Sequence, residues 1–180
     1  MHRRKLLGLL DQYAATYPAE EQVIRRFVDF VQDEPRCFER DCWRGHVTGS
    51  AWLLDQNLQR LLLTHHKKLD MWLQLGGHSD GESDTPLVAM REAEEESGVV
   101  VQLLRAQILD IDIHEIPARK SDPAHYHFDV RFCFQAQSDD VAVSDESNDL
   151  AWIEISAIER FTQEESILRM RDKWLSLANS

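Results

Sequence analysis

Three glutamates lie close together in the middle of the chain, and their spacing predicts a cation-binding site. Glu92, Glu95 and Glu96 are three residues and one residue apart, so a helix carries their carboxylates on one face. Like charges on one face repel each other unless a cation lies among them. Mg²⁺ and Mn²⁺ suit such a site, since hard divalent ions prefer oxygen ligands and often bind a few carboxylates together with substrate phosphates.

The flanking residues predict the helix that positions these carboxylates. Thr85 is expected as its N-cap, with Pro86 at the first helical position and Gly98 just past its end. A solvated helix face with an ion pair between Arg91 and Glu95 is the alternative interpretation.

Residues 77 to 99 resemble the Nudix box, whose pattern is Gly-x5-Glu-x7-Arg-Glu-apolar-x-Glu-Glu-x-Gly-apolar. Gly77 matches the opening glycine, and the later matches are Arg91, Glu92, Ala93, Glu95, Glu96, Gly98 and Val99. One position departs, because the first glutamate of the pattern falls at Ser83, whereas Glu82 lies one place earlier. The loop before Glu82 is thus one residue shorter and the turn after it one residue longer, so we expect Glu82 to point into the site.

This resemblance implies an α/β fold, a Nudix-type α/β/α sandwich with a mixed sheet, over about residues 46 to 178. It also implies hydrolysis of the diphosphate bond in a nucleoside diphosphate linked to another group, such as a nucleotide sugar or a dinucleotide. The implied ligands of Mg²⁺ or Mn²⁺ are Gly77, through its carbonyl, and Glu92, Glu95 and Glu96. Arg91 is expected to orient the glutamates.

A second acidic segment offers a candidate base. Many Nudix proteins carry a Glu-x-x-Glu-like loop before an aromatic residue, and its carboxylate serves as general base or metal ligand. Glu146 and Asp149, ahead of Trp152, match that spacing. Either Glu92 or Glu146 would accept the proton of the attacking water. A solvated acidic loop is the alternative.

Two segments of alternating apolar and polar residues, 109 to 114 and 128 to 134, predict a β-hairpin with a buried apolar face. Its polar positions are Asp110, Asp112, His114, Asp129 and Arg131. We expect these side chains to face a substrate cleft, and an exposed polar face is the alternative. The candidate substrate-binding residues are His78, Asp80, His127, Asp129 and Arg131.

Several histidines raise a separate question. His125 and His127 are two residues apart, so a strand places both on one face. Together with His78 and His114 they could form a zinc site, because zinc favours imidazole. Substrate binding or ordinary polar packing is favoured, since no carboxylate–histidine spacing of a dedicated zinc motif accompanies them.

The composition excludes some classes of partner. The 180-residue chain has a formal net charge of −12, whereas nucleic acids and anionic membranes bind basic surfaces. We therefore expect neither as a partner. The three cysteines lack the pairing of a zinc motif, and the start of the chain is too short and too amphipathic for a signal peptide. These features favour a reduced, cytoplasmic protein.

The chain divides into an N-terminal helical segment, residues 1–45, and a domain of residues 46–180. Apolar residues recur at helical spacing twice before residue 33. We expect a helical hairpin that packs on the domain and takes no part in the chemistry, with dimerisation or covering of the substrate as the alternatives. Further strands are expected at 47–54, 60–64 and 150–155, and a last helix after Thr162.

Two other functions fit the same fold. An isomerase of allylic diphosphates would need a cysteine–glutamate proton pair and a histidine-bound metal. A non-catalytic ligand sensor tends to lose the box glutamates and to add a DNA-binding segment, whereas this chain keeps the glutamates. A small-molecule nucleoside diphosphate derivative is the expected partner, and a homodimer stays open.

Overall fold

A computed structural model describes residues 2–67, 70–119, 122–142 and 147–178. Its strands are β1 (His46–Leu54), β2 (Arg60–His66), β3 (Met71–Leu73), β4 (Leu75–His78), β5 (Val101–Leu103), β6 (Asp110–Ile116), β7 (His125–Ala136) and β8 (Ser147–Glu154). Its helices are α1 (Arg4–Thr16), α2 (Glu21–Asp33), α3 (Thr85–Ser97) and α4 (Glu165–Ala178), with short 3₁₀ helices at Pro18–Glu20 and Ile155–Arg160. In these ranges, no helix is long and apolar enough to cross a membrane.

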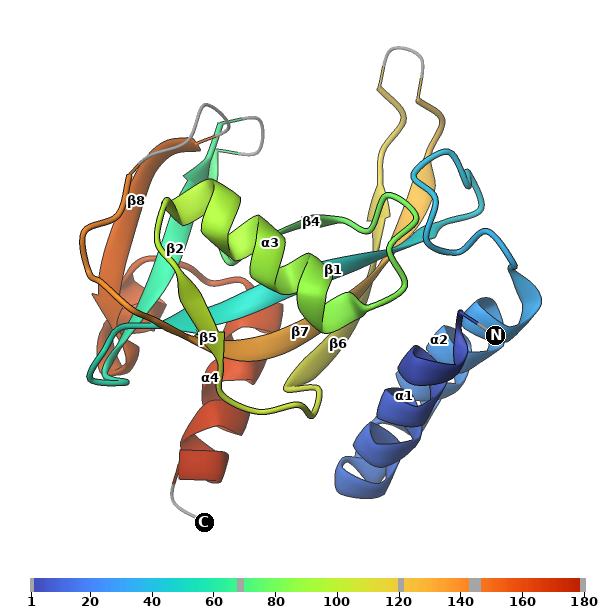
Figure 1. The fold of residues 1–180 in the computed structure, drawn as a ribbon, viewed down its shortest axis with the longest axis horizontal. Coiled ribbons are helices and arrows are strands. Elements are labelled where there is room, and N and C mark those ends of the chain that lie inside the picture. Colours follow the sequence, from blue (N-terminus) through green and yellow to red (C-terminus); the bar gives the residue numbers. More distant parts are fainter. Residues whose placement is uncertain (1, 68–69, 120–121, 143–146, 179–180) are drawn as a thin grey trace.

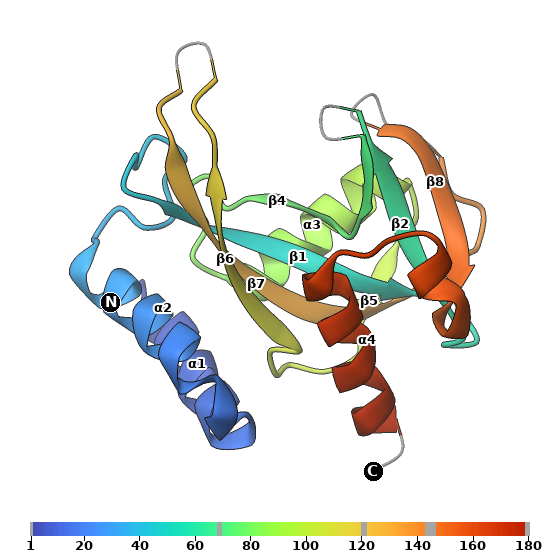
Figure 2. The same cartoon turned by 180° about the vertical axis from the view of Figure 1, so that it is seen from behind.

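The described strands form one mixed sheet with β1 at its centre. The order is β3-β2-β1-β7-β5, and β4, β6 and β8 pair with β1, β7 and β2. Strand β1 runs parallel to β7 and antiparallel to β4. The expected hairpin of β6 and β7 is confirmed. Helices α3 and α4 lie on opposite faces of the sheet (Figures 1 and 2). The architecture is therefore the α/β/α sandwich that the sequence predicted.

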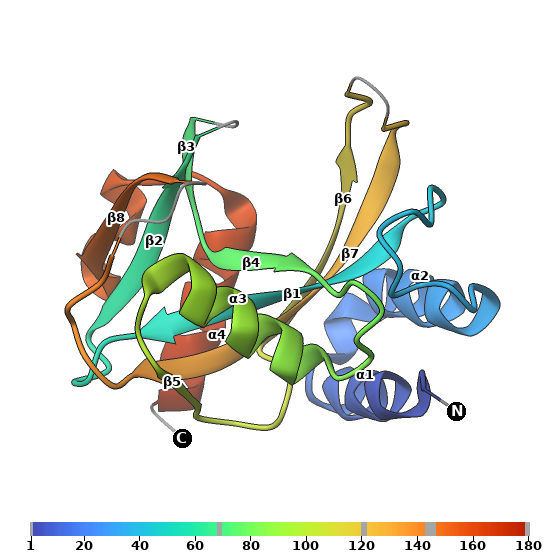
Figure 3. The ribbon, with the colours of Figure 1, turned by 45° about the horizontal axis from the view of Figure 1, so that its top comes forward.

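The N-terminal helices pack against the sheet through their apolar stripes. Helix α1 buries Leu6, Leu10 and Tyr13, which are four and three residues apart. Helix α2 places Phe27 and Phe30 on the Phe128 ring of β7, with ring centroids 5.3 and 3.8 Å apart. Both helices lie side by side next to β7 (Figure 3). Their buried residues belong to the same hydrophobic cluster as the sheet. The division of the chain at residue 45 stays a prediction.

Helix α4 covers the face of the sheet opposite α3, and it places positively charged side chains against that face. The expected stripe of Ile167, Met170 and Trp174 is buried. Lys173 is buried too, at 8% exposed, and its ammonium contacts Asp110 at 2.7 Å and Glu20 at 2.6 Å. The Arg169 guanidinium donates two hydrogen bonds to the same Asp110 carboxylate, at 2.9 and 2.8 Å.

The polar face of the β6–β7 hairpin is buried at Asp110, Asp129 and Arg131, whereas Asp112 and His114 are partly exposed. Asp110, Asp129 and Arg131 are at most 2% exposed, so they line neither an open cleft nor a solvated surface. Arg131 donates to Asp129 at 2.7 Å and to Asp110 at 3.0 Å. The physical reason is that α4 supplies counter-charges, which let carboxylates stay buried.

Replacing Lys173 with Met should lower the free energy of unfolding by about 3 kcal/mol, because the change removes one of the cations that compensate the buried Asp110 carboxylate and breaks the ion pair with Glu20. Urea unfolding followed by circular dichroism measures this. The control is Arg25→Met, which removes an exposed ion pair with Glu21 and should cost less than about 1 kcal/mol. Equal losses in the two variants would contradict the buried network.

Candidate functional site

The glutamate helix begins one residue earlier than the sequence predicted. Asp84, and not Thr85, is the N-cap of α3, and Thr85 and Pro86 both lie within the helix. The Asp84 carboxylate accepts a hydrogen bond from Lys5 of α1 at 2.6 Å, so a tertiary contact holds this end. Gly98 ends the helix in the left-handed conformation, with φ of 73°, as predicted.

Helix α3 lies unusually close to the sheet because glycines face it. A Cβ at Gly49 of β1 would lie 2.9 Å from the backbone nitrogen of Ala89. A Cβ at Gly77 of β4 would overlap the carboxylate of Glu92. Any larger residue at either position would push the helix or its glutamates away from β4.

Two of the three predicted metal-binding glutamates touch this glycine strand. The Gly76 backbone N–H donates to Glu96 at 2.8 Å. Arg91 donates one hydrogen bond to the Glu92 carboxylate and another to the backbone carbonyl of His78, both at 2.8 Å. Arg91 thus pairs with Glu92 and not with Glu95, the partner that helical spacing suggested. Glu95 is exposed on the same helix.

The electrostatics at Glu92 are those of an anionic site. Burial raises the pKa of its carboxyl above the ordinary value, and the charges of Glu95 and Asp80 raise it further. The Arg91 hydrogen bond opposes this rise without cancelling it. Ionising Glu92 therefore costs free energy in the folded protein, and a bound cation would recover that cost.

The two acidic residues of the preceding loop have local partners. The exposed Glu82 carboxylate accepts the backbone N–H of Asp84 at 2.8 Å, which supports the turn before α3. Asp80 forms an ion pair with Arg40, and that hydrogen bond lowers the pKa of the Asp80 carboxyl. The expectation that Glu82 points into the site stays a prediction.

The second acidic segment is only partly described. Glu146 lies outside the described residues. Asp149 is exposed at the beginning of β8, and its carboxylate accepts the backbone N–H of Leu150 at 2.9 Å. The role of this loop stays a prediction.

The predicted substrate-binding residues fall into two groups. His78 and His127 lie together, with ring centroids 5.2 Å apart, and Asp80 lies in the loop that follows His78. Asp129 is instead buried beside Arg131, and its carboxylate accepts hydrogen bonds from the hydroxyls of Thr48 and Ser50 at 2.9 and 2.8 Å. These internal bonds give Asp129 and Arg131 a structural role, whereas contact of His78, Asp80 and His127 with a substrate stays a prediction.

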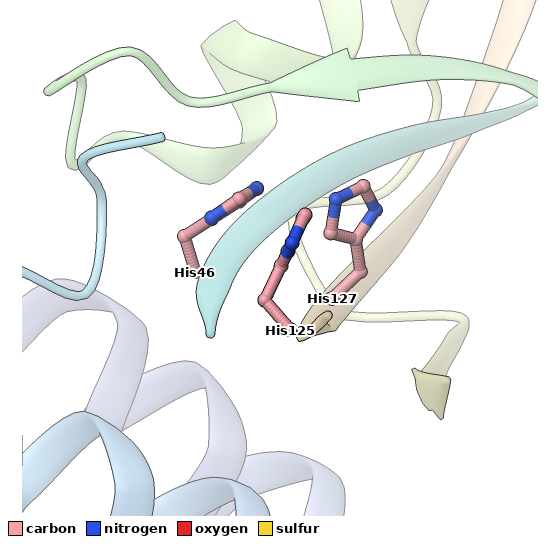
Figure 4. Close-up of side chains that lie close together, drawn as sticks. All are labelled: His46, His125 and His127. Atoms are coloured by element: carbon pink, nitrogen blue, oxygen red, sulfur yellow. The ribbon is translucent and has the colours of Figure 1, made fainter. Parts of the chain in front are cut away.

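A histidine that sequence reasoning missed completes a cluster at the start of β1. The rings of His46, from β1, and of His125 and His127, from β7, converge (Figure 4). Burial lowers the pKa of His46 to about 4 and that of His127 to about 2, with help from the neighbouring imidazoles. The His46 and His127 imidazoles are therefore neutral at physiological pH. Only the pairing of β1 with β7 brings residues 46 and 127 opposite each other.

The protein also has a hollow that lies away from the glutamates of α3. Its volume is about 420 Å³, and Arg25, Arg26, Arg44 and Tyr126 are among the residues that line it. No residue of α3 or β4 lines this hollow, so the glutamate chemistry does not take place in it.

Comparisons with known proteins identify the fold. No model of a protein family and no curated protein matches the sequence. A NUDIX-family hydrolase from Clostridium perfringens is similar in structure, with a TM-score of 0.54 and 23% identity over 73% of this chain and 97% of its own. The dihydroneopterin triphosphate pyrophosphohydrolase of E. coli has a TM-score of 0.54 and 16% identity, over 70% of this chain and 92% of its own.

A third example is an Ap4A hydrolase of C. elegans in a binary complex, with a TM-score of 0.53 and 15% identity over 74% of this chain and 97% of its own. At these identities the likeness shows the fold. The chain has the fold of Nudix hydrolases, as the sequence predicted.

The raised pKa of Glu92 predicts how stability depends on pH. A raised folded-state pKa contributes stability that is fully present below the unfolded pKa and is lost as pH rises through the folded pKa. In the presence of a chelator, Glu92→Gln should therefore be more stable than the wild type at pH 7, by up to about 1 kcal/mol, and should lose this advantage below about pH 4.

Asp80→Asn is the control, and its stability at pH 7 should change in the opposite direction. The lowered pKa of Asp80 contributes stability above the unfolded pKa that is lost on acidification, so this variant should be less stable than the wild type at pH 7. Urea unfolding across pH 3 to 8 measures both. A Glu92→Gln variant that is less stable at every pH would contradict the anionic site.

Proposed function

We propose that this chain, which has the Nudix fold, is a metal-dependent pyrophosphohydrolase that cleaves the diphosphate bond of a nucleoside diphosphate linked to another group. The observation that carries the proposal is the contact between the glutamates of α3 and the glycine strand β4. Glu96 accepts the Gly76 N–H, and Glu92 fills the space that a side chain at Gly77 would occupy. Carboxylates are thereby held against a partly exposed stretch of backbone.

The donor set suits a hard divalent cation. The proposed ligands are the carboxylates of Glu92, Glu95 and Glu96 and the carbonyl of Gly77, which all offer oxygen. Mg²⁺ and Mn²⁺ prefer such donors over nitrogen or sulfur. The rise in the pKa of Glu92, caused by burial and then by neighbouring negative charge, supports a place for a cation here.

The residues of the chain would divide the remaining work. A bound cation would neutralise the charge that develops on the phosphate oxygens. Glu92 would accept the proton of the attacking water, because its carboxylate lies at the proposed cation site. Arg91 donates hydrogen bonds to the His78 carbonyl and to the Glu92 carboxylate, and it would thereby hold Glu92 in place. Glu146 is the other candidate base.

The substrate class rests on the fold and on the names of proteins with similar structures. Those names include an Ap4A hydrolase and a dihydroneopterin triphosphate pyrophosphohydrolase. Nucleotide sugars and dinucleotides are therefore the first compounds to test, in a panel of nucleotide derivatives with Mg²⁺ or Mn²⁺.

An allylic diphosphate isomerase is the second candidate function. The histidine cluster offers the kind of metal site that this reaction needs. The proton-transferring cysteine is the difficulty, because all three cysteines are buried and burial raises the pKa of Cys37 and of Cys133 to about 12. Isotope exchange into isopentenyl diphosphate would decide for the isomerase. A ligand sensor ranks last, since the box glutamates are present.

Replacing Glu96 with Gln should slow hydrolysis by about two orders of magnitude, because the change removes one charge and weakens an oxygen ligand. Gln keeps the acceptor for the Gly76 N–H, so the fold should remain. The control is Glu94→Gln on the same helix, whose carboxylate accepts the Val101 N–H at 3.1 Å and which should keep most of the activity. An active Glu96→Gln enzyme with unchanged Mg²⁺ dependence would refute the metal assignment.

Replacing Glu82 with Gln tests the displaced box glutamate. If Glu82 contributes to metal or water binding, turnover should fall and the Mg²⁺ concentration for half-maximal rate should rise. Gln preserves the acceptor for the Asp84 N–H, so the turn before α3 should survive. Unchanged turnover with unchanged metal dependence would mean that Glu82 only supports the loop.

A further inference from the structure

The histidine cluster at the start of β1 has the composition and spacing of a metal site. His46, His125 and His127 each offer a ring nitrogen, and these atoms lie within 4.8 Å of one another. Three nitrogens bound to one zinc ion lie roughly 3.4 Å apart, given Zn–N distances of about 2.0–2.1 Å. Small rotations of the rings would close this difference. Figure 4 shows the three side chains close together, with His46 from β1 and with His125 and His127 from β7.

Buried nitrogens without partners point to a missing ligand. His46 is 1% exposed, and among the described residues neither of its ring nitrogens has a hydrogen-bond partner. The Nε2 of His127 is also buried, and it too has no hydrogen-bond partner among the described residues. Buried polar atoms are nearly always satisfied, and the exceptions often mark an unseen ion or water.

His125 is already oriented for binding. Its Nδ1 lies 2.8 Å from the carbonyl oxygen of Pro123. Since a carbonyl only accepts, Nδ1 must carry the proton, and Nε2 keeps a free lone pair. A hydrogen bond from the second ring nitrogen to a backbone carbonyl is the usual way in which proteins orient a metal-binding histidine.

We propose that His46, His125 and His127 bind a divalent transition-metal ion of the Zn²⁺ class. Three imidazoles without a carboxylate favour such borderline ions over Mg²⁺ or Ca²⁺. A site with three protein ligands leaves a coordination position for an outside ligand. This ion differs in chemistry from the one proposed at the glutamates, so the inference does not depend on the proposed hydrolysis.

The two sites adjoin through a single residue. The His78 carbonyl accepts a hydrogen bond from Arg91, the partner of Glu92. The ring of the same His78 lies with its centroid 5.0 Å from that of His46. The histidine site therefore adjoins the glutamate site.

The test uses the purified full-length chain, stripped with a chelator and titrated with Zn²⁺ alone and with Co²⁺ alone. Calorimetry should show about one equivalent of Zn²⁺ bound, in the presence of excess Mg²⁺. The visible absorption of Co²⁺ should report nitrogen coordination without the charge-transfer band of a thiolate. That band would instead locate the ion at the cysteines and overturn the proposal.

Variants separate the histidine site from the glutamate site. His46→Asn and His127→Asn should each weaken Zn²⁺ binding at least about tenfold, while Glu96→Gln and the surface control His65→Asn should leave it unchanged. If His46→Asn fails to fold by circular dichroism, His125→Asn and the Co²⁺ spectrum of the wild type decide the question. No bound Zn²⁺, or binding that is lost in Glu96→Gln and kept in the histidine variants, would overturn the proposal.

Discussion

The close approach of helix α3 to the sheet is the constraint on which the candidate site depends. Gly49 of β1 and Gly77 of β4 lie opposite each other on adjacent paired strands. Neither has a side chain at the point where α3 passes. That absence lets the helix settle on β1 and β4, so that Glu92 and Glu96 reach the backbone of the glycine strand. Acidic side chains and backbone groups then form one surface, which neither the helix nor the strand could present alone.

The sheet keeps this acidic surface apart from a second set of charges. Under α4, Asp110 lies at the centre of a buried network with Arg131, Arg169 and Lys173. Tyr13 and Glu20 of the N-terminal segment join the same network. Buried ion pairs contribute little net stability but make a wrong arrangement costly. The network therefore fixes how α1, α4 and the sheet meet, and through β7 it also fixes the strand that carries His125 and His127.

Regular periodicities explain what could be predicted from the sequence. One buried face explains each helical stripe, in α1, α2 and α4, and also the alternation along β6 and β7. Local spacing in the sequence is therefore sufficient to predict these elements. The glutamate helix was found in the same way, and Gly98 marked its end. Its first residue differs by one, because Asp84 and Thr85 are adjacent and both residue types are favoured N-caps. The burial of Asp110, Asp129 and Arg131 cannot be read from the hairpin's own sequence, because the counter-charges that cover Asp110 come from α4.

His46 shows a second limit of sequence reasoning. It directly precedes the strand that the sequence predicts at 47–54, and no spacing relates it to His127. Their proximity follows from the parallel pairing of β1 with β7, which is a property of the whole fold. Parallel strands need a long connection, so residues that meet across them leave no local pattern. The buried, unpartnered nitrogens of His46 became visible only in three dimensions.

The most direct test of the central claim is an anomalous difference map from crystals of the full chain grown with Mn²⁺. We expect a Mn²⁺ peak bounded by the carboxylates of Glu92 and Glu96 and the carbonyl of Gly77. A map with no peak there at saturating Mn²⁺, or with its only peak among the histidines, would contradict the proposal that α3 and β4 together form the metal site of a hydrolase.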